Sequence, residues 1–528
     1  MTSVPLILAE FALGGIDVGV IAVYLAIVVW IGVASRRSHP GRREEFLLAG
    51  RSMPVVAVAI SVLATMQSAA TFVGGPQESY AGDLTYLATN LATLIAVIIV
   101  ATRFLPAFYR ARVTTVYEFL GHTFGNDAQR CGSMLFLMGR LLASGARLYI
   151  IAIPFSLFAF GSINAEVMMV SIIIIATIAM TYTMIGGVRA VIWTDVLQAS
   201  VYIVAVIAAL ALLLQKIPLD IGTVTEALAH DDKIRIIEWN PTNVYSIWGV
   251  LTGWTLFMIA ALGTDQDLTQ RMLTCSSPKR SATSLIVSTI MSWPVVMLFL
   301  LLGSLLYIYY QRTDLMGDAA PAYAINDSRK VFIEFIRMEI PAGLRGLMLA
   351  GLFAAAMSSL DSALNAMAST VVADFYRPWR RSRGSRGAVA HERDVAVARM
   401  SIAVFAALLA GVACVCVRMY DAERDTLISF ALGIMIFAYG GLLGVFLTAL
   451  FTSRGNNHSA VAGMLAGFIA VVAMRPHLWA TWAERFLNTD LGETPAIALP
   501  WQMCVATGVS FGICALGKRP TMRRRTAV

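Results

Sequence analysis

The sequence predicts an all-α polytopic membrane protein, and its composition is the first observation behind this expectation. Of the 528 residues, 58% are hydrophobic and 14% are charged, whereas soluble domains average about 45–50% apolar and about 25% charged residues. Apolar runs recur along the whole chain, and each is long enough for a bilayer core, which needs roughly 20 residues of helix. No stretch remains for a separate soluble domain, so we expect one transmembrane domain over residues 1–528.

The apolar runs predict about thirteen membrane-spanning helices and their orientation. Arginines gather in alternate loops and in the C-terminal tail, for example at Arg42, Arg43, Arg386 and Arg524. The positive-inside rule then places the N-terminus outside and the C-terminus in the cytoplasm of a multi-pass cell-membrane protein, which requires an odd number of spans. The expected spans are residues 16–35, 53–80, 85–109, 134–161, 163–186, 190–215, 244–263, 281–310, 343–376, 397–418, 426–452, 459–475 and 497–517.

Two of these spans are interrupted. The second has a polar centre at Thr65, Gln67, Ser68 and Thr71 and then meets the run Gly74, Gly75, Pro76, and the seventh is interrupted at Gly263, Thr264, Asp265 and Gln266. Broken helices five spans apart indicate inverted five-helix repeats with a site at the membrane midplane between them. We therefore expect repeats over 53–215 and 244–452, with flanking helices at 16–35, 459–475 and 497–517.

The ninth span carries a polar cluster in the middle of an apolar helix. Ser358, Ser359, Asp361 and Ser362 lie there, and a carboxylate alone costs about 2.5–3.5 kcal/mol at such a depth. With 3.6 residues per turn, the two adjacent serines and Ser362 share a face with Ala355. A backbone carbonyl and three hydroxyl oxygens can thus converge on one point, which suits a hard cation such as sodium.

Several other classes of function are disfavoured. The net charge of +8 comes from arginines in short loops and the tail, as a topology signal would place them, so we expect no nucleic-acid partner. The six cysteines are scattered without metal-ligand spacing. No HExxH or GxSxG motif marks an intramembrane enzyme, and broken helices around one core favour an occluded site over a channel pore. No obligate protein partner is indicated; the expected partners are membrane lipid, a cation and a small solute.

Four segments carry a resemblance to a known family. They are YTMIGGVRAVIWTDVLQ (Tyr182–Gln198), the stretch Leu352–Trp379, the stretch Gly50–Pro76 and the stretch Leu442–Gly467. In this order and on these spans they resemble the sodium:solute symporter family. The resemblance implies a LeuT-type core of inverted five-helix repeats and uptake of a small organic solute driven by inward sodium flow, with alternating access.

Carried over by position, the resemblance implies one sodium site. Its ligands would be the backbone carbonyls of Ala64, Gln67 and Ala355 and the hydroxyls of Ser358 and Ser359. The family site thus coincides with the polar cluster of the ninth span. The alternative is that the serine hydroxyls bond back to carbonyls one turn earlier, as often happens in membrane helices.

A second cation site, or the ion's route, is implied around Asp195 on the sixth span. Members that bind a second sodium add hydroxyls of the ninth span, here Ser358 and Ser362, but this chain has Asp361 where those members have Ser or Thr. The alternative for Asp195 is neutralisation by neighbouring Arg189. The two carboxylates leave the sodium number open and keep proton coupling as the alternative mechanism.

The solute side is less defined. The resemblance implies contacts from Thr65, Ser68 and Thr71 on the broken second span. On the seventh span, sugar transporters of the family place aromatic and amide residues where this chain has Met258, Ala260, Ala261 and Leu262, so we expect no aromatic stacking gate for a sugar ring.

Two arginines lie inside the fourth span, Arg140 and Arg147. A guanidinium at membrane depth needs an anion, and a planar fork pairs best with a carboxylate. That carboxylate is either a protein acid such as Asp361 or belongs to the solute. The second option favours a carboxylate solute bound by Arg147; a neutral sugar or polyol is the alternative.

Overall fold

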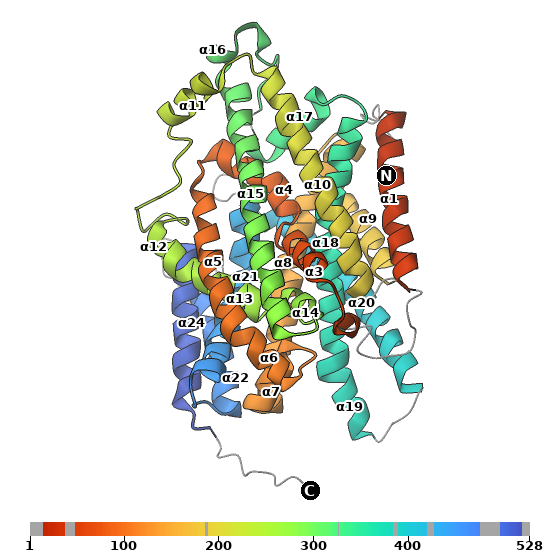
Figure 1. The fold of residues 1–528 in the computed structure, drawn as a ribbon, viewed down its shortest axis with the longest axis vertical. Helices are drawn as coiled ribbons and strands as arrows, with labels where there is room; N and C mark the ends of the chain where they lie inside the picture. The colour runs from red at the N-terminus through yellow and green to blue at the C-terminus, as the bar shows by residue number, and fades with distance from the viewer. Residues whose placement is uncertain are drawn as a thin grey trace, which may run out of the picture.

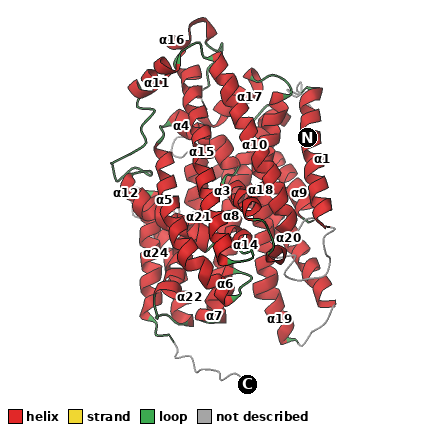
Figure 2. Ribbon diagram, viewed as in Figure 1, coloured by secondary structure: helices red, strands yellow, loops and turns green. Residues whose placement is uncertain are grey.

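The computed structural model describes residues 14–36, 48–184, 188–325, 327–383, 389–419, 427–475 and 497–519. Throughout these ranges the chain is a bundle of helices joined by short loops, with no strand (Figure 2). Some arginines behind the predicted orientation, among them Arg42, Arg43, Arg386 and Arg524, lie outside the described residues.

The main helices follow the predicted spans, either singly or as consecutive segments of one span. In the N-terminal half they are α1 (Gly15–Arg36), α3 (Val55–Met66), α4 (Ala69–Ala81), α5 (Thr89–Ile99), α6 (Leu105–Ala111), α8 (Asn126–Phe160), α9 (Ala165–Thr183) and α10 (Val188–Lys216). In the C-terminal half they are α13 (Thr255–Gly263), α14 (Gln266–Met272), α15 (Pro278–Gln311), α18 (Leu344–Thr370), α20 (Val389–Met419), α21 (Leu427–Phe451), α22 (Asn457–Ala473) and α24 (Leu499–Leu516).

Short elements connect or extend these helices. The connecting helices are α7 (Val116–Thr123), α11 (Ile221–His230), α12 (Ile247–Gly249), α16 (Thr313–Met316), α17 (Val331–Glu339) and α19 (Arg377–Ser382). Single turns of π-helix occur at Val100–Phe104, Val250–Trp254 and Val371–Tyr376. In Figure 1, α1 lies at one edge of the bundle and the packed pair α22 and α24 lies at the other.

In the described part of the chain, nine helices are long and apolar enough to cross a membrane, and the number rises to eleven if each of two bent pairs forms one span. Two shorter apolar helices cover 165–181 and 457–473. In the described residues, each predicted span therefore overlaps one helix or a series of consecutive helical segments. The protein is a multi-pass membrane protein.

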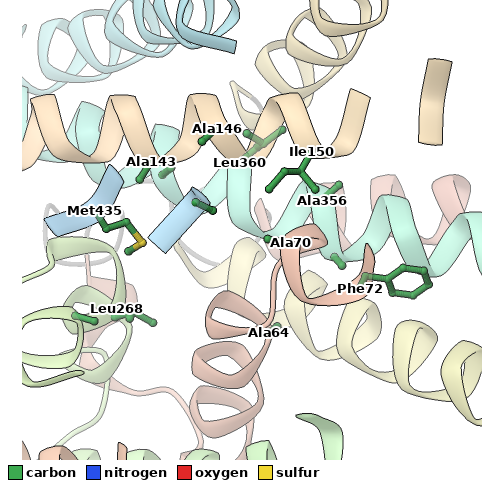
Figure 3. Packing of buried hydrophobic residues seen from close by; sticks show 14 of the residues in the cluster. Ala64, Ala70, Phe72, Ala143, Ala146, Ile150, Leu268, Ala356, Leu360 and Met435 are labelled. Carbon is green, nitrogen blue, oxygen red and sulfur yellow. The ribbon is translucent and has the colours of Figure 1, made fainter. Parts of the chain in front are cut away.

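The second predicted span is broken, as its polar centre indicates. Helices α3 and α4 meet at an angle of 56°, and the residues between them, Gln67 and Ser68, have extended backbone. Figure 3 shows Ala64 near the end of α3 and Ala70 near the start of α4, which packs against α18. Ser68 caps α4 by accepting a hydrogen bond from the Ala70 N–H at 3.2 Å.

The glycines and proline that follow this break lie inside α4 and serve close packing. A Cβ on Gly75 would come within 3.0 Å of Phe299 on α15. In return, a Cβ on Gly303 of α15 would lie 2.1 Å from the carbonyl oxygen of Pro76. Because Gly75 and Gly303 have no side chain, α4 and α15 pack closely against each other.

The seventh predicted span is broken in the same manner. The helix that ends at Gly263 and α14 meet at 60°. Asp265 lies between them with extended backbone and caps α14 by accepting a hydrogen bond from the Asp267 N–H at 2.9 Å. Both breaks lie in the interior, because Gln67, Asp265 and Gln266 are all buried.

Helix α18 runs through the centre of the bundle between α8, α10 and α20. Its first turn is held by Asp17 of α1, whose Oδ1 accepts from the backbone N–H groups of Gly343 at 2.7 Å and Gly346 at 2.9 Å. Arg345 completes this contact by pairing with Asp17 at 2.9 Å. A carboxylate at the start of a helix is favourable for the orphan N–H groups and for the dipole.

Candidate functional site: a polar cavity between two broken helices

A partly open cavity lies between the two breaks. Its volume is about 90 Å³, which is room for several water molecules. Side chains from α3, α5, α8, α13, α15 and α21 surround it. The polar ones are Thr65, Gln67, Thr89, Asn90, Thr93, Arg140, Arg147, Ser292 and Tyr439.

Arg147 of α8 faces this cavity, and none of the acidic side chains that the structure describes forms an ion pair with it. The residue is 8% exposed, its Nη2 lies 3.6 Å from the thioether sulfur of Met435, and its Nη1 has no hydrogen-bond partner among the described residues. Buried guanidinium groups are normally paired. The cavity wall therefore contains a guanidinium group whose Nη1 is available to an anionic ligand.

Arg140, which precedes Arg147 by about two turns of α8, is paired with acidic residues. Its Nη1 pairs with Asp265 Oδ2 at 3.2 Å and its Nη2 with Asp267. Tyr439 of α21 donates a further hydrogen bond to Asp265 Oδ2 at 2.6 Å. Arg140 is thus a structural arginine that ties α8 to the second break.

Aromatic side chains line the cavity, including one from the seventh span. Phe257 of α13 packs against Tyr439 with ring centroids 5.2 Å apart, and Tyr86 also lines the cavity. The expected absence of an aromatic stacking gate for a sugar ring stays a prediction, while Phe257 places one aromatic ring in the cavity wall. The helix turns Phe257, which immediately precedes Met258, toward the cavity.

Of the three predicted solute contacts on the second span, one lines the cavity and two do not. Thr65 lines the cavity, while its hydroxyl donates to the Ser61 carbonyl at 2.8 Å. Ser68 is occupied as the cap of α4, and neither Ser68 nor Thr71 belongs to the cavity wall. Gln67 takes their place, with its side-chain amide donating to Ser292 at 2.9 Å.

The predicted sodium ligands lie on two adjacent helices. Ala64 is in the last turn of α3, where carbonyl groups have no partner within the helix, and Gln67 follows directly in the break. Ala355, Ser358 and Ser359 lie on α18, which packs against α3. All five residues are buried. Helix-end carbonyls together with hydroxyls form an oxygen set that fits sodium.

The two serines differ in their hydrogen bonds. Ser359 donates back to the carbonyl of Ala355 at 3.3 Å, as the alternative reading of the sequence proposes. Ser358 instead donates to Asp195 Oδ1 at 2.6 Å. The proton of Ser358 is thus committed to the carboxylate, which leaves its oxygen lone pairs for another partner.

Asp195 of α10 is fully buried and joins three helices. Its Oδ1 accepts from Ser358 of α18, and its Oδ2 accepts from Ser61 of α3 at 2.5 Å. The charge is balanced by Arg271 of α14, whose Nη2 lies 3.2 Å from Oδ2. Arg189, the partner that the alternative interpretation gave to Asp195, donates to Ser52 instead. Arg189 therefore does not neutralise this carboxylate.

Asp361 and Ser362 have different hydrogen-bond partners. The Asp361 carboxylate accepts from Thr183 of α9 at 2.7 Å, and no ion pair joins it to Arg147 among the described residues. Ser362 accepts a hydrogen bond from Arg271 and donates to the Ser358 carbonyl. Of the residues expected at a second cation site, Asp195 and Ser362 meet around Arg271.

Arg271 and Asp267 are the functional candidates that the sequence reasoning missed. They lie in the segment DQDLTQRML, four residues apart, and Arg271 Nη1 pairs with Asp267 Oδ1 at 2.6 Å. The signal was present, because two acids and an arginine directly follow an interruption in an apolar span. Such intramembrane charges are functional candidates by default.

A membrane bundle in which two broken helices flank a cavity with polar groups, with helix-end carbonyls and hydroxyls beside it, has the architecture of a secondary transporter. The model of the sodium:solute symporter family matches residues 46–467, and the chain belongs to this family. The family consists of sodium-coupled transporters and not of enzymes, and sodium is the coupling ion.

The fold agrees with solved transporters. The chain superimposes on a Na⁺-coupled sialic acid symporter, solved in a substrate-bound outward-open state, with a TM-score of 0.76 and 25% identity over 95% of this chain and 97% of that chain. Mhp1, a nucleobase-cation-symport-1 family transporter, shares the fold with a TM-score of 0.51 at 14% identity.

Curated relatives cover most of the chain. The human sodium-coupled monocarboxylate transporter 1 is 27% identical over 86% of this chain and 72% of its own length. The sodium/sialic acid symporter SiaT of Proteus mirabilis is 28% identical over 88% and 90%. The human sodium/iodide cotransporter is 26% identical over 86% and 68%.

Proposed function

We propose that this symporter imports a small organic solute that carries a carboxylate, and that Arg147 binds the carboxylate. The observation that carries the proposal is the buried guanidinium of Arg147, which faces the cavity with Nη1 unpartnered and only a thioether beside Nη2. A bidentate arginine–carboxylate contact would complete its hydrogen bonds and neutralise its charge.

The rest of the cavity supports a solute with both polar and apolar parts. Thr65, Asn90 and Gln67 offer hydrogen bonds, while Phe257 and Tyr86 offer apolar faces. Relatives named for monocarboxylates, sialic acid and iodide transport anions. This agrees with a cationic side chain in the cavity wall.

The sodium site that we propose comprises the carbonyls of Ala64, Gln67 and Ala355 and the hydroxyls of Ser358 and Ser359. The end of α3 and the middle of α18 supply these atoms, and Gln67 also reaches the solute cavity with its side chain. Sodium bound there would hold the broken helix in the shape that forms the cavity. This arrangement would couple the two binding events.

The proposed topology has thirteen spans, with the N-terminus outside and the C-terminus in the cytoplasm of the cell membrane. The shorter apolar helices at 165–181 and 457–473 bring the eleven spans to thirteen. The proposed inverted repeats cover 53–215 and 244–452, and each contains one of the two breaks.

The test is a thermal-shift and uptake screen in sodium over monocarboxylates, sialic acid, sugars and polyols, followed by the variant Arg147→Lys. The lysine keeps the charge but loses the fork. We expect a carboxylate ligand whose affinity falls roughly ten- to hundred-fold in the variant, which corresponds to about 1.5–3 kcal/mol. Arg329→Lys, in an ion pair with Asp327 away from the cavity, is the control. If only uncharged sugars or polyols bind, the carboxylate proposal is wrong.

A further inference from the structure

Helix α7 lies at the same end of the bundle as the last turn of α24 (Figure 1). It leads directly into α8, where the backbone N–H of Ala128 donates to Asn457 Oδ1 at the start of α22 at 3.0 Å. Just before α22, the N–H of Gly455 donates to the carbonyl of Gly517, which follows α24, at 2.8 Å. The proposed topology, with the C-terminus in the cytoplasm, therefore places α7 on the cytoplasmic side.

The first turn of α7 is bonded to the second break through Gln266 and Tyr117. The side-chain amide of Gln266 accepts from the Val116 N–H at 2.9 Å through Oε1 and donates to the Thr114 carbonyl at 3.2 Å through Nε2. The Tyr117 hydroxyl donates to the carbonyl of Thr264 at 2.9 Å. Helix α7 thus supplies hydrogen-bond partners to an interrupted backbone that would otherwise need water.

The start of α7 is held on its other side by Asp374. This residue is 1% exposed and lies in the π-helical turn Val371–Tyr376 that follows α18. Its carboxylate accepts from the hydroxyl of Thr115, the N-cap of α7, at 2.9 Å, and from Gln129 and Ser133 of α8 at 2.8 and 2.7 Å. One buried carboxylate therefore fastens α7 to α8 and to the end of α18.

The bonds of α7 to the second break cross between the two proposed repeats. Thr264 and Gln266 belong to the repeat over 244–452, whereas α7 and α8 belong to the repeat over 53–215. Alternating access moves one group of helices against the other around the binding site. An opening of the cytoplasmic side that separates the second break from α8 would break the bonds of Gln266 and Tyr117 to α7, so their strength would set how often this side opens.

We propose that α7 is a cytoplasmic latch, which Gln266 and Tyr117 close onto the second break and which Asp374 anchors to α8 and α18. The latch is closed in this structure and opens when the transporter releases sodium and solute into the cell. Gln266 and Tyr117 are positioning residues of the second break and not ligands of the solute. The proposal rests on the proposed topology and does not depend on the chemistry of the solute.

The test measures how fast a membrane-impermeant maleimide reaches a cysteine placed beneath the latch. Thr264→Cys is introduced into the full-length protein after its six native cysteines are replaced by alanine. Thr264 suits this purpose because it is fully buried and its carbonyl accepts from Tyr117. The reagent is applied to proteoliposomes from the side on which a C-terminal tag is accessible, and the labelling rate then follows the population of the open form.

Two variants weaken the latch in this background. Gln266→Ala removes two hydrogen bonds to α7 and Tyr117→Phe removes one, so we expect the labelling rate to rise roughly ten-fold or more in the first and about five-fold in the second. The matched control is Gln502→Ala on α24, outside the repeats. Gln502 is also buried and also uses both ends of its amide, accepting from Arg475 at 3.0 Å and donating to the Ile497 carbonyl at 2.7 Å. Its replacement should leave the labelling rate unchanged.

An unchanged labelling rate in both latch variants, or an equal rise in Gln502→Ala, would overturn the proposal. If the melting curve of Gln266→Ala shows that it does not fold, Tyr117→Phe decides, because it removes only a hydroxyl. A C-terminal tag that is accessible from outside intact cells would overturn the cytoplasmic assignment. Failure of every carboxylate to bind would refute the proposed solute and leave the latch intact.

Discussion

Asp267 and Arg271 form an ion pair across one turn of α14, with Nη1 and Oδ1 2.6 Å apart. The same carboxylate pairs with Arg140, which lines the solute cavity, and the same guanidinium pairs with Asp195, which orients Ser358. A continuous chain of charged groups therefore joins the solute cavity to the sodium-site helix. If Arg140 moves, its ion pair with Asp267 changes, and the ion pair between Asp267 and Arg271 changes with it.

The first prediction tests this connection with Asp267→Asn. The amide can accept from one arginine but cannot neutralise two, so we expect the solute and sodium sites to lose part of their coupling. Binding coupling between sites is typically about 1–3 kcal/mol, or roughly 5- to 150-fold. Sodium affinity measured with and without saturating solute should show such a factor in the unaltered protein and a factor near 1 in the variant. Asp327→Asn, outside the cavity, is the control, and an undiminished factor in Asp267→Asn would contradict the idea.

The second prediction concerns the sodium ligands. Ser359→Ala removes a hydroxyl that the backbone cannot replace, and Ser358→Ala removes a hydroxyl and also frees Asp195 Oδ1. We expect the sodium concentration for half-maximal uptake to rise about ten-fold or more in each variant, because a hydrogen-bonding group that faces a charge contributes about 1.5–3 kcal/mol. Ser401→Ala on α20, where the hydroxyl bonds only within its helix, should leave it unchanged. Unaltered sodium dependence in both variants would place the ion elsewhere.

The sequence predicts the fold of this protein better than it predicts the contacts within the site. Spans and breaks are visible because membrane helices need long apolar runs and because polar residues inside them stand out, as at Gln67 and Asp265. The oxygen cluster of α18 is visible for the same reason. Helical periodicity places Ser358, Ser359 and Ser362 on one face without any knowledge of the neighbouring helices.

The partners of charged residues are not visible in this way. Arg189 is close to Asp195 in sequence, yet Arg271 is close in space, because α14 turns back toward α10 and α18 after the break. Arg140 and Arg147 have the same setting in the sequence, and only the fold shows that one meets Asp265 while the other faces a cavity. Such pairings depend on the bend angle, which the sequence does not encode locally.

The third prediction concerns the coupling ion in transport. Serine hydroxyls and backbone carbonyls can bind sodium but cannot take up a proton near neutral pH. Uptake into proteoliposomes should therefore follow an imposed sodium gradient at constant pH and continue when a protonophore collapses the proton gradient. Potassium in place of sodium is the control. Loss of uptake with the protonophore, while the sodium gradient remains, would show that a buried acid such as Asp361 contributes a coupled proton.

The fourth prediction concerns the packing that positions the first break. In Gly303→Ala, the new Cβ would lie 2.1 Å from the Pro76 carbonyl oxygen, and a backbone neighbour cannot move aside as a side chain can. We expect α4 to shift away from α15, with a loss of about 1–3 kcal/mol in stability and a lower solute affinity. Gly508→Ala on α24, which meets nothing within 4 Å, is the matched control. Equal melting temperatures for the two variants would refute the close contact.

The last prediction separates the Asp195–Arg271 pair from its neighbours by a double-mutant cycle. Asp195→Asn leaves a buried guanidinium with one acid instead of two, and Arg271→Gln leaves a buried carboxylate with only serine hydroxyls. Removing one partner of a buried ion pair typically costs about 3–5 kcal/mol, so each single variant should melt well below the unaltered protein. The double variant has neither orphan charge. We therefore expect its loss of unfolding free energy to be smaller than the sum of the two single losses by about 1–3 kcal/mol.

Asp195→Asn should also weaken sodium binding, because an amide no longer holds the Ser358 proton as firmly and the lone pairs of Ser358 turn from the ion. Strictly additive melting temperatures would mean that the two residues do not interact across the bundle, and Asp195 would then act on α18 through Ser61 and Ser358 alone.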